Sequence, residues 1–281
     1  MTPTPQEMHA RGRERFVADP SKCYQRHIRE LYEELEGRKS PCTAECYEVK
    51  VNPKTGHKKY GSCPHLEGYT VREITRDEAE SIILKYEWLQ SMGRGVQACY
   101  GLFSAEGELM GANCLGRMGG GVGDICGPGY ENKTVCLMRG VCVPHAPKNA
   151  GSFFTSQTCE KAHADFGWSI FFGYSDSAAG EIGQIYKSCN WVCLGQGPGK
   201  PEGSFHTDFQ SPDGSRIVTS YDLNHDKKKK LASSLGWDES KGPVRQYLRR
   251  SGWKPIRRAA KTKFVWFEGP DRGKLGAKCR F

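Results

Sequence analysis

Three cysteines and a histidine gather in a short segment that shows no apolar periodicity. Cys42 and Cys46 are separated by three residues, and sixteen residues later come Cys63 and, two positions on, His65. Thiolate and imidazole are preferred zinc ligands, and a bound metal stabilises a segment that lacks a core of its own. The spacing predicts a structural zinc site at these four residues, with His57 as a substitute fourth ligand. The alternative is three reduced thiols with His65 on the surface.

The last fifth of the chain carries the excess of positive charge. Residues 226–281 hold 17 Lys and Arg against 5 Asp and Glu, whereas residues 76–225 hold 11 against 16, and the whole chain has a net charge of +9. Tyrosine, tryptophan and phenylalanine are interleaved with these cations, so that both phosphate contact and base stacking are available. The segment is therefore predicted to bind nucleic acid through cations that include Lys254, Arg257 and Arg258. The alternative is a solvated basic tail without a specific partner.

One arginine lies inside an apolar run. Arg139 belongs to TVCLMRGVCV, residues 134–143, which is about one strand long. An unpaired charge in such a strand is costly, so Arg139 is expected to pair with a carboxylate or with an anionic ligand. A purely structural ion pair is the alternative.

Helices and strands alternate in the elements that must position these residues. Thr75 and Glu78 form a capping-box pattern ahead of an amphipathic stripe, and Gly167 follows another helical stripe as a terminator. The expected elements are one charged helix within 1–40, an irregular module at 41–69, a helix over 75–93, a hairpin over 97–117, a strand over 134–143, a helix over 150–165, a strand over 168–175, a helix over 177–190, a strand over 191–197, and a strand and turn over 206–214.

Length and composition limit the class of protein. With 281 residues, 37% hydrophobic and 26% charged, the chain is expected to fold as one main domain with small attachments. No apolar run approaches the roughly 20 residues that span a bilayer, and the first residues lack a signal-peptide core. The thirteen cysteines are odd in number and scattered, which indicates reduced thiols. We expect a cytoplasmic protein without a membrane partner, divided into a helix and cysteine module at 1–70, a catalytic domain at 71–225 and a basic nucleic-acid-binding segment at 226–281.

The order of hairpin, strand, helix and strand resembles the GNAT acyltransferase superfamily. That resemblance implies an α/β (α+β) fold with a central mixed sheet, whose splayed strands are flanked by helices. The family carries Gln/Arg-x-x-Gly-x-Gly/Ala before its central helix; here Lys148 and Gly151 keep the cation and the first glycine, and Phe153 replaces the second small residue. More specifically, residues 75–200 resemble the phage Mom-like DNA adenine-modification proteins through the strings KYEWLQSMG, ACYGLF, LMRGVCV, PKNAGSFF and FFGYSD.

The resemblance implies an acyl-CoA-like donor that binds at the first turn of the central helix. A helix N-terminus presents unpaired N–H groups and partial positive charge, and small residues let an anion approach the backbone. The residues implied in donor binding are Arg139, Lys148, Asn149, Ala150, Gly151 and Ser152. Tyr186 stands where GNAT enzymes often carry a tyrosine that protonates the leaving thiolate, and core packing is its alternative role.

The resemblance to Mom-like proteins also implies that the substrate is the N6 amine of adenine. This amine is a poor nucleophile, so an enzyme must remove a proton from it and must also hold the flipped base. Glu87 and Asp176 are predicted to take the proton, and Trp88 and Tyr174 to form the base pocket. Mom-like proteins usually carry His where Glu87 stands. Solvated-edge and N-cap roles are the alternatives for Glu87 and Asp176 respectively.

His145 follows the strand over residues 134–143 and would lie near the donor if the resemblance holds. It is a candidate base or iron ligand, with a surface histidine as the alternative. Together with Glu87 and Asp176 it has the ligand types of a carboxylate and imidazole metal site, although their spacing alone demonstrates none.

The resemblance implies a DNA-modifying transferase that acts on double-stranded DNA and a small-molecule donor. Its product would be a carbamoylmethylated or related N6-adenine that protects phage DNA from restriction in the host cytoplasm. One alternative is an acetyl-CoA-dependent N-acetyltransferase that acts on amines of RNA or protein. Another is a zinc-dependent nucleic-acid-binding protein without enzymatic activity.

Overall fold

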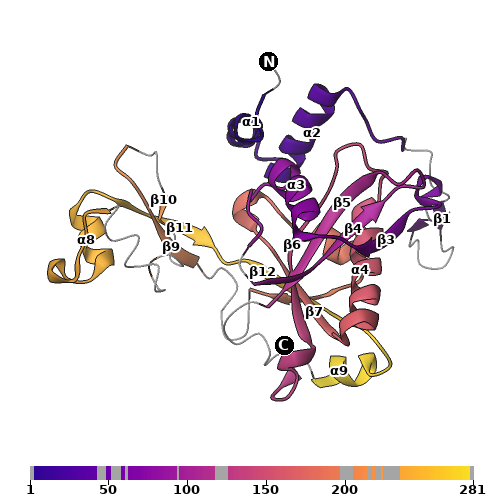
Figure 1. The fold of residues 1–281 in the computed structure, drawn as a ribbon. Helices are drawn as coiled ribbons and strands as arrows, with labels where there is room; N and C mark the ends of the chain where they lie inside the picture. The colour runs from indigo at the N-terminus through magenta and orange to yellow at the C-terminus, as the bar shows by residue number, and fades with distance from the viewer. Residues whose placement is uncertain are drawn as a thin grey trace.

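A seven-stranded sheet forms the centre of the computed structural model (Figure 1). In spatial order its strands are β3 (Thr70–Glu73), β4 (Val96–Phe103), β5 (Leu109–Gly116), β6 (Thr134–Cys142), β7 (Ile170–Ser175), β12 (Thr262–Phe267) and β8 (Val192–Gly195). Neighbouring strands pair antiparallel, except that β6 and β7 are parallel. The structure describes residues 3–42, 49–51, 58–60, 63–93, 95–117, 126–196, 205–213, 217–218, 223 and 235–278.

The parallel strands β6 and β7 diverge part-way along their length. Their pairing extends only from Thr134 to Cys136 on β6 and from Ile170 to Phe172 on β7. Beyond these residues β6 continues its pairing with β5, and β7 continues its pairing with β12. The predicted fold class, a mixed α/β sheet with splayed central strands and flanking helices, is confirmed.

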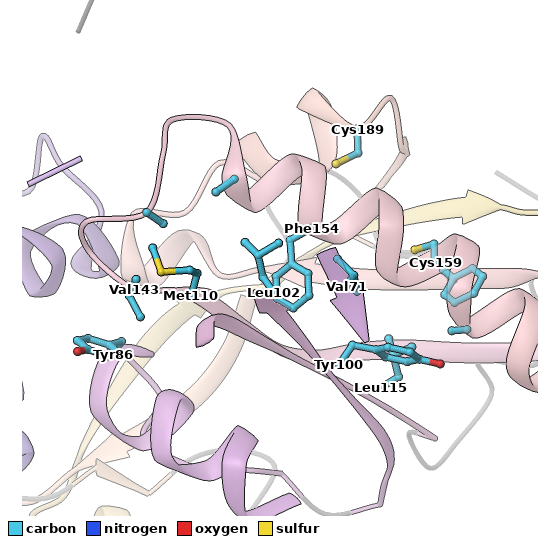
Figure 2. Close-up of a cluster of buried hydrophobic side chains, with 14 of the residues drawn as sticks. Val71, Tyr86, Tyr100, Leu102, Met110, Leu115, Val143, Phe154, Cys159 and Cys189 are labelled. Atoms are coloured by element: carbon cyan, nitrogen blue, oxygen red, sulfur yellow. The ribbon is translucent and has the colours of Figure 1, made fainter. Parts of the chain in front are cut away.

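Helix α4 (Ala150–Phe166) packs on one face of the sheet. Phe154, in its second turn, is buried in the same apolar cluster as Leu102 of β4 (Figure 2). Burying a phenylalanine contributes roughly 1.5–3 kcal/mol. Asn113 adds a buried hydrogen bond, in which Nδ2 donates to Thr158 Oγ1 over 3.0 Å. These contacts fix the start of α4, and therefore the loop that precedes it.

Helix α3 (Arg76–Tyr86) covers the opposite face. The predicted capping box is confirmed: Thr75 accepts from the backbone of Glu78, and the Glu78 carboxylate accepts from the backbone of Thr75. Ile83 is fully buried and packs in a cluster with Cys99. The helix ends at Tyr86, so the residues after it emerge at the edge of this packed layer.

The N-terminal region forms two helices where the sequence predicted one: the predicted charged helix is present as the second, and the first was not predicted. Helix α1 (Pro5–Ala18) ends before Pro20, and α2 (Tyr24–Glu36) begins after it. Proline lacks an N–H group and restricts the residue before it, which favours a turn at this point. Tyr24 Oη donates to His9 O over 2.8 Å and ties the two helices together.

The helix expected over residues 177–190 is also interrupted. The structure contains a short 3-10 helix, η4 (Ser177–Ala179), and the five-residue helix α5 (Gln184–Ser188). Gly180 and Gly183 between them have φ of 72° and 69°. Glycine adopts this left-handed conformation at little cost, so the pair lets the chain turn between the two short helices.

Gly183→Ala is expected to destabilise the protein by about 2–4 kcal/mol, because a left-handed alanine costs roughly 1–2 kcal/mol and overpacking adds a similar amount. A Cβ atom at position 183 would overlap the ring of Phe264. Thermal unfolding should show a melting temperature lower by roughly 5–10 °C. Gly37→Ala is the matched control, because Gly37 has φ of 65° but no atom near its Cβ position. Equal losses in both variants would contradict the packing argument.

A three-stranded sheet lies apart from the central sheet (Figure 1). Its strand order is β10 (Ile217–Val218), β9 (Phe205–Gln210) and β11 (Lys254–Ala259), and helix α8 (Val244–Arg250) packs on it around the buried Phe209. We call this unit the small basic sheet. Strand β12 follows β11 and lies within the central sheet, so the segment of residues 254–267 contributes to both sheets.

The remaining described elements are short. They are β1 (Val49–Val51), β2 (Lys58–Tyr60), η1 (Pro64–Leu66), η3 (Glu131–Lys133), η5 (Glu239–Lys241) and α9 (Arg272–Lys278). Within the ranges that the structure describes, no helix has both the length and the apolar character needed to cross a membrane.

Candidate functional site

Glu87 is a buried carboxylate at the C-terminal end of α3. It is 6% exposed, its Oε2 accepts from Leu89 N over 3.0 Å, and the same oxygen lies 3.9 Å from Arg139 Nε. Burial raises the pKa of Glu87 to about 7, although Arg139 and the Leu89 amide oppose the rise. At neutral pH this carboxyl group is therefore close to its midpoint, where it both accepts and releases a proton readily. The solvated-edge alternative does not fit this burial.

Arg139 reaches Glu87 from β6, at a point beyond the stretch of β6 that pairs with β7. Its guanidinium also donates to the backbone oxygen of Ser91 and, over 3.0 Å, to Ser91 Oγ. Arg139, the cation within the apolar strand, thus pairs with the Glu87 carboxylate and is held by the loop that carries Ser91.

Asp176 ends β7 and is 1% exposed. Its Oδ1 accepts from Ala178 N over 3.0 Å, which is the N-cap role considered for it, and its Oδ2 lies 3.5 Å from Lys261 Nζ. A second carboxylate lies beside it, because Glu181 Oε2 accepts from Asp176 N over 2.8 Å.

Glu181 connects Asp176 to Glu87. Its Oε1 accepts from Trp88 Nε1 over 2.9 Å, and Trp88 directly follows Glu87. Burial raises the pKa of Glu181, and the charge of Glu181 in turn contributes to the raised pKa of Glu87. Glu87, Asp176 and Glu181 are therefore one group, which we call the carboxylate cluster. It lies where β6 and β7 diverge.

Glu87 and Asp176 were predicted from the sequence, whereas Glu181 and Lys261 were not. Glu181 falls in the stretch expected to be helical, where it looked like an ordinary surface residue. The two glycines at 180 and 183 on either side of Glu181 were the available indication that the chain turns there. Lys261 was hidden among the many cations of the basic segment.

The aromatic residues predicted to hold the base lie near the carboxylate cluster. Trp88 is half-buried and packs edge-on against Tyr24 at a centroid distance of 5.9 Å. Tyr174 is half-buried on β7, and Lys263 Nζ lies 5.8 Å from its ring centroid. Burial raises the pKa of Tyr174 to about 12, so its hydroxyl is neutral.

Tyr186 shows features of both roles considered for it. Its ring stacks on Phe264 at a centroid distance of 4.9 Å, which is core packing. Its hydroxyl lies 3.5 Å from Tyr174 O, and burial raises its pKa, so the group keeps its proton at neutral pH. A protonated hydroxyl is the form that a proton donor to a thiolate requires.

The structure places His145 away from the carboxylate cluster. Its ring is 7% exposed, so the surface alternative is wrong, and its Nε2 lies 3.5 Å from Glu108 Oε1. That contact is within ion-pair range but too long for a strong hydrogen bond, and neither ring nitrogen has a hydrogen-bond partner among the described residues. Burial lowers the pKa of His145, which favours the neutral ring. Glu108 is instead held by both guanidinium nitrogens of Arg38, at 2.8 and 2.9 Å.

The predicted metal sites have different outcomes. His145 lies beside Glu108 and does not join Glu87 and Asp176, and the described residues contain no group of three side chains that suits a metal ion. In the cysteine module, Cys42 Sγ and Cys63 Sγ lie 3.2 Å apart, and the structure places His65 on the surface. Cys46 and His57 lie outside the described residues, so the zinc site stays a prediction.

The loop predicted to bind the donor does open α4, as the sequence indicates. Asn149 is the N-cap residue with φ of 67°, and the helix begins at Ala150. Lys148 and Asn149 are exposed, while Gly151 and Ser152 are half-buried. A Cβ atom at Gly151 would meet Ile185 at 3.4 Å, so this first turn lies against α5, which also carries Tyr186.

The small basic sheet presents several of the predicted nucleic-acid contacts. Lys254 and Arg257 are exposed on β11, and Arg249 and Arg250 are exposed on α8. The side chain of Arg258 is outside the described part of the structure.

Comparison with solved structures finds several acetyltransferases at low identity. One is the IAA acetyltransferase from Bacillus cereus, at 11% identity over 71% of this chain and 99% of that chain, with a TM-score of 0.37. Another is a chimeric spermidine N-acetyltransferase from Vibrio cholerae, at 9% identity over 75% of this chain and 99% of that chain, with a TM-score of 0.39. A putative phosphinothricin N-acetyltransferase matches at 12% identity over 53% of this chain and 92% of that chain, with a TM-score of 0.36. No curated protein matches the sequence significantly.

The family comparison matches the segment that contains the diverging strands and all three members of the carboxylate cluster. The model of the Mom protein family aligns with residues 68–247, which is more than half of the sequence, and the chain therefore belongs to the Mom protein family.

Proposed function

We propose that this protein is a transferase that modifies the N6 amine of adenine in double-stranded DNA. The observation that carries the proposal is the buried Glu87, whose pKa is raised to about 7, beside Arg139 in a chain of the Mom family. Perturbed carboxylates of this kind are enriched at catalytic sites. The product would be an N6-modified adenine, such as the carbamoylmethylated base, and would protect phage DNA from restriction.

Glu87 is assigned the role of proton acceptor. The lone pair of the adenine amine is delocalised into the ring, so a nitrogen–carbon bond forms readily only if a base takes the proton as the bond develops. A carboxylate with a pKa near 7 is ionised in a large fraction of molecules and is still basic enough to accept that proton. Arg139, 3.9 Å away, stabilises the ionised form before the transfer.

Asp176 and Glu181 are assigned to the orientation of this base. Glu181 holds the Trp88 indole and the Asp176 amide at the same time, so it fixes the end of α3 relative to the end of β7. Trp88 and Tyr174 are the aromatic surfaces nearest to the cluster. Stacking on such surfaces offsets the few kcal/mol that extrusion of a base from the duplex costs.

The donor is assigned to the first turn of α4. An acyl-CoA-like donor would carry a pyrophosphate, and the exposed Lys148 with the amides of Gly151 and Ser152 suits its negative charge. Gly151 packs against α5, which brings this turn and Tyr186 to neighbouring positions. Tyr186, whose buried hydroxyl keeps its proton, is the residue assigned to protonate the group that leaves the donor.

The test is mass spectrometry of nucleosides from DNA of cells that express the protein, with cells carrying the empty vector as the control. The expected result is a new deoxyadenosine adduct. An adduct with the mass of N6-acetyl-2′-deoxyadenosine would indicate acetyl transfer instead, because acetyl transfer gives an amide rather than an N-alkyl product. Unchanged deoxyadenosine together with tight DNA binding would overturn the proposal in favour of a binding protein.

Tyr186→Phe provides a narrower prediction. The variant keeps the stacking on Phe264 and loses only the hydroxyl group, so the melting temperature should change little. If the hydroxyl protonates the leaving group, turnover should fall by about a hundredfold, at the lower end of the range for proton-transfer catalysis. Initial rates with purified protein, DNA and donor measure the effect. Full activity in this variant would assign Tyr186 to packing alone.

A further inference from the structure

Lys261 lies between the two sheets of the molecule. Together with Ala260 it connects β11 of the small basic sheet to β12 of the central sheet. Its ammonium group lies 3.5 Å from Asp176 Oδ2, and the Asp176 side chain is only 2% exposed, whereas the Lys261 side chain is 44% exposed. A cation that is half in solvent thus touches a fully buried carboxylate.

The charge of Lys261 reaches the whole carboxylate cluster. It lowers the pKa of Glu87 and that of Glu181, in addition to its direct contact with Asp176. The other groups that act on the pKa of Glu87 are Arg139, the Leu89 amide and Glu181. Arg139 is anchored to a loop by hydrogen bonds to Ser91, whereas Lys261 is attached to the strand that leads to the small basic sheet.

The small basic sheet also touches the cluster through its backbone. Strand β11 contacts η4, the 3-10 helix that Asp176 caps. Two contacts therefore connect Asp176 to this sheet: β11 packs against η4, and the Lys261 side chain, just after β11, lies against the Asp176 carboxylate. A shift of the small basic sheet would therefore act on Asp176 through the packing of β11 on η4 and through the connection that carries Lys261.

We propose that Lys261 is a positioning residue, which holds Asp176 where β6 and β7 diverge. Through this contact, the protonation of the carboxylate cluster depends on the placement of the small basic sheet. The functional part of this inference rests on the proposed function, since DNA bound by the small basic sheet would act on the carboxylate cluster through Lys261. The contact itself does not depend on the identity of the substrate.

The test follows the titration of Glu87 by NMR with 13C-labelled glutamate side chains, in protein without donor, and Glu87→Gln assigns the signal. In Lys261→Met the titration midpoint should move upward by about half a unit to one unit, because a partly solvated cation is removed. Lys261→Arg should restore the original midpoint. Lys187→Met, which removes an equal charge from the exposed surface of α5, should leave it unchanged. Circular dichroism verifies that each variant is folded.

A second measurement adds a duplex oligonucleotide to the same samples. The Glu87 titration should shift on DNA binding in the wild-type protein, and the shift should be smaller by at least half in Lys261→Met. An unchanged midpoint in Lys261→Met, an equal change in Lys187→Met, or an equal DNA-induced shift in both proteins would overturn the inference. These titrations need no turnover, so they can succeed while the nucleoside analysis fails, and the reverse is equally observable.

Discussion

Replacing Glu87 by Gln is expected to reduce the rate of adenine modification by about a hundredfold or more, the usual effect of removing a catalytic base. Glutamine has the same size and keeps an oxygen that accepts from the Leu89 amide, so the packing at the end of α3 is preserved. The variant loses the capacity to take a proton and the negative charge that faces Arg139. Initial rates at saturating DNA and donor, with adduct quantified by mass spectrometry, measure the change.

The pH dependence gives a second measure of the same variant. Because the pKa of Glu87 is about 7, the wild-type rate should rise as pH increases through 7 and then level off, and the residual rate of Glu87→Gln should lack this rise.

The free energy of unfolding should respond to pH in the opposite direction. The pKa in the folded protein is higher than in the unfolded chain, so the stability contributed by the protonated group is complete below about pH 4.5 and is lost as pH rises through 7. Chemical unfolding across this range should show that Glu87→Gln removes this loss.

Asp165→Asn is the matched control for Glu87→Gln. Asp165 accepts a hydrogen bond from Tyr100 and lies at the end of α4, outside the carboxylate cluster. This variant should keep the pH profile of the wild-type protein. A Glu87→Gln variant with normal rate and normal pH profile would remove the catalytic assignment of Glu87.

The second large effect is expected in DNA binding. A triple variant, Arg249→Gln with Arg250→Gln and Lys254→Gln, removes three exposed cations from the small basic sheet. Each lost phosphate contact reduces the slope of log affinity against log salt by about one, so the slope should fall by about three. Affinity at near-physiological salt should fall by about tenfold or more. Fluorescence anisotropy with a labelled duplex at several salt concentrations measures both quantities.

The control for the triple variant removes the same charge elsewhere. Arg11→Gln, Arg13→Gln and Arg76→Gln change exposed cations at α1 and at the start of α3. An equal loss of affinity in the two triple variants would show that DNA responds to net charge rather than to the small basic sheet. Normal binding in the first variant would remove this sheet from the proposed interface.

Local sequence patterns predicted those parts of the fold that local interactions determine. The capping box of Thr75 and Glu78 marked the start of α3, and Gly167, with φ of 71°, ends α4 as expected. Glycine tolerates the left-handed conformation that closes a helix, so its position carries information that a single sequence contains. The same reasoning failed for 177–190, because the apolar spacing there suggested one helix while Gly180 and Gly183 break it.

The candidate site was only partly predictable because its members meet through long-range packing. Glu87 and Asp176 were identified from their places at the ends of elements, which the resemblance to a known fold supplied. Lys261 joins them only because β12 returns to the central sheet from a separate unit, and no local pattern encodes that return. Glu181 joins them through the turn after η4, which brings it against the Asp176 amide and the Trp88 indole. The place of His145 was not predicted either, because the residue that faces its ring, Glu108, lies in the turn before β5, distant in sequence.

The position of β12 has a consequence for biosynthesis. This strand is formed by Thr262–Phe267, which follow both β7 and β8 in the chain, yet it lies between them in the sheet. Until the ribosome has produced these residues, β7 has an open edge and β8 has no neighbour in the central sheet. Unpaired strand edges promote association between chains, so nascent protein should depend on chaperones until release, and premature stop codons before residue 262 should yield insoluble product.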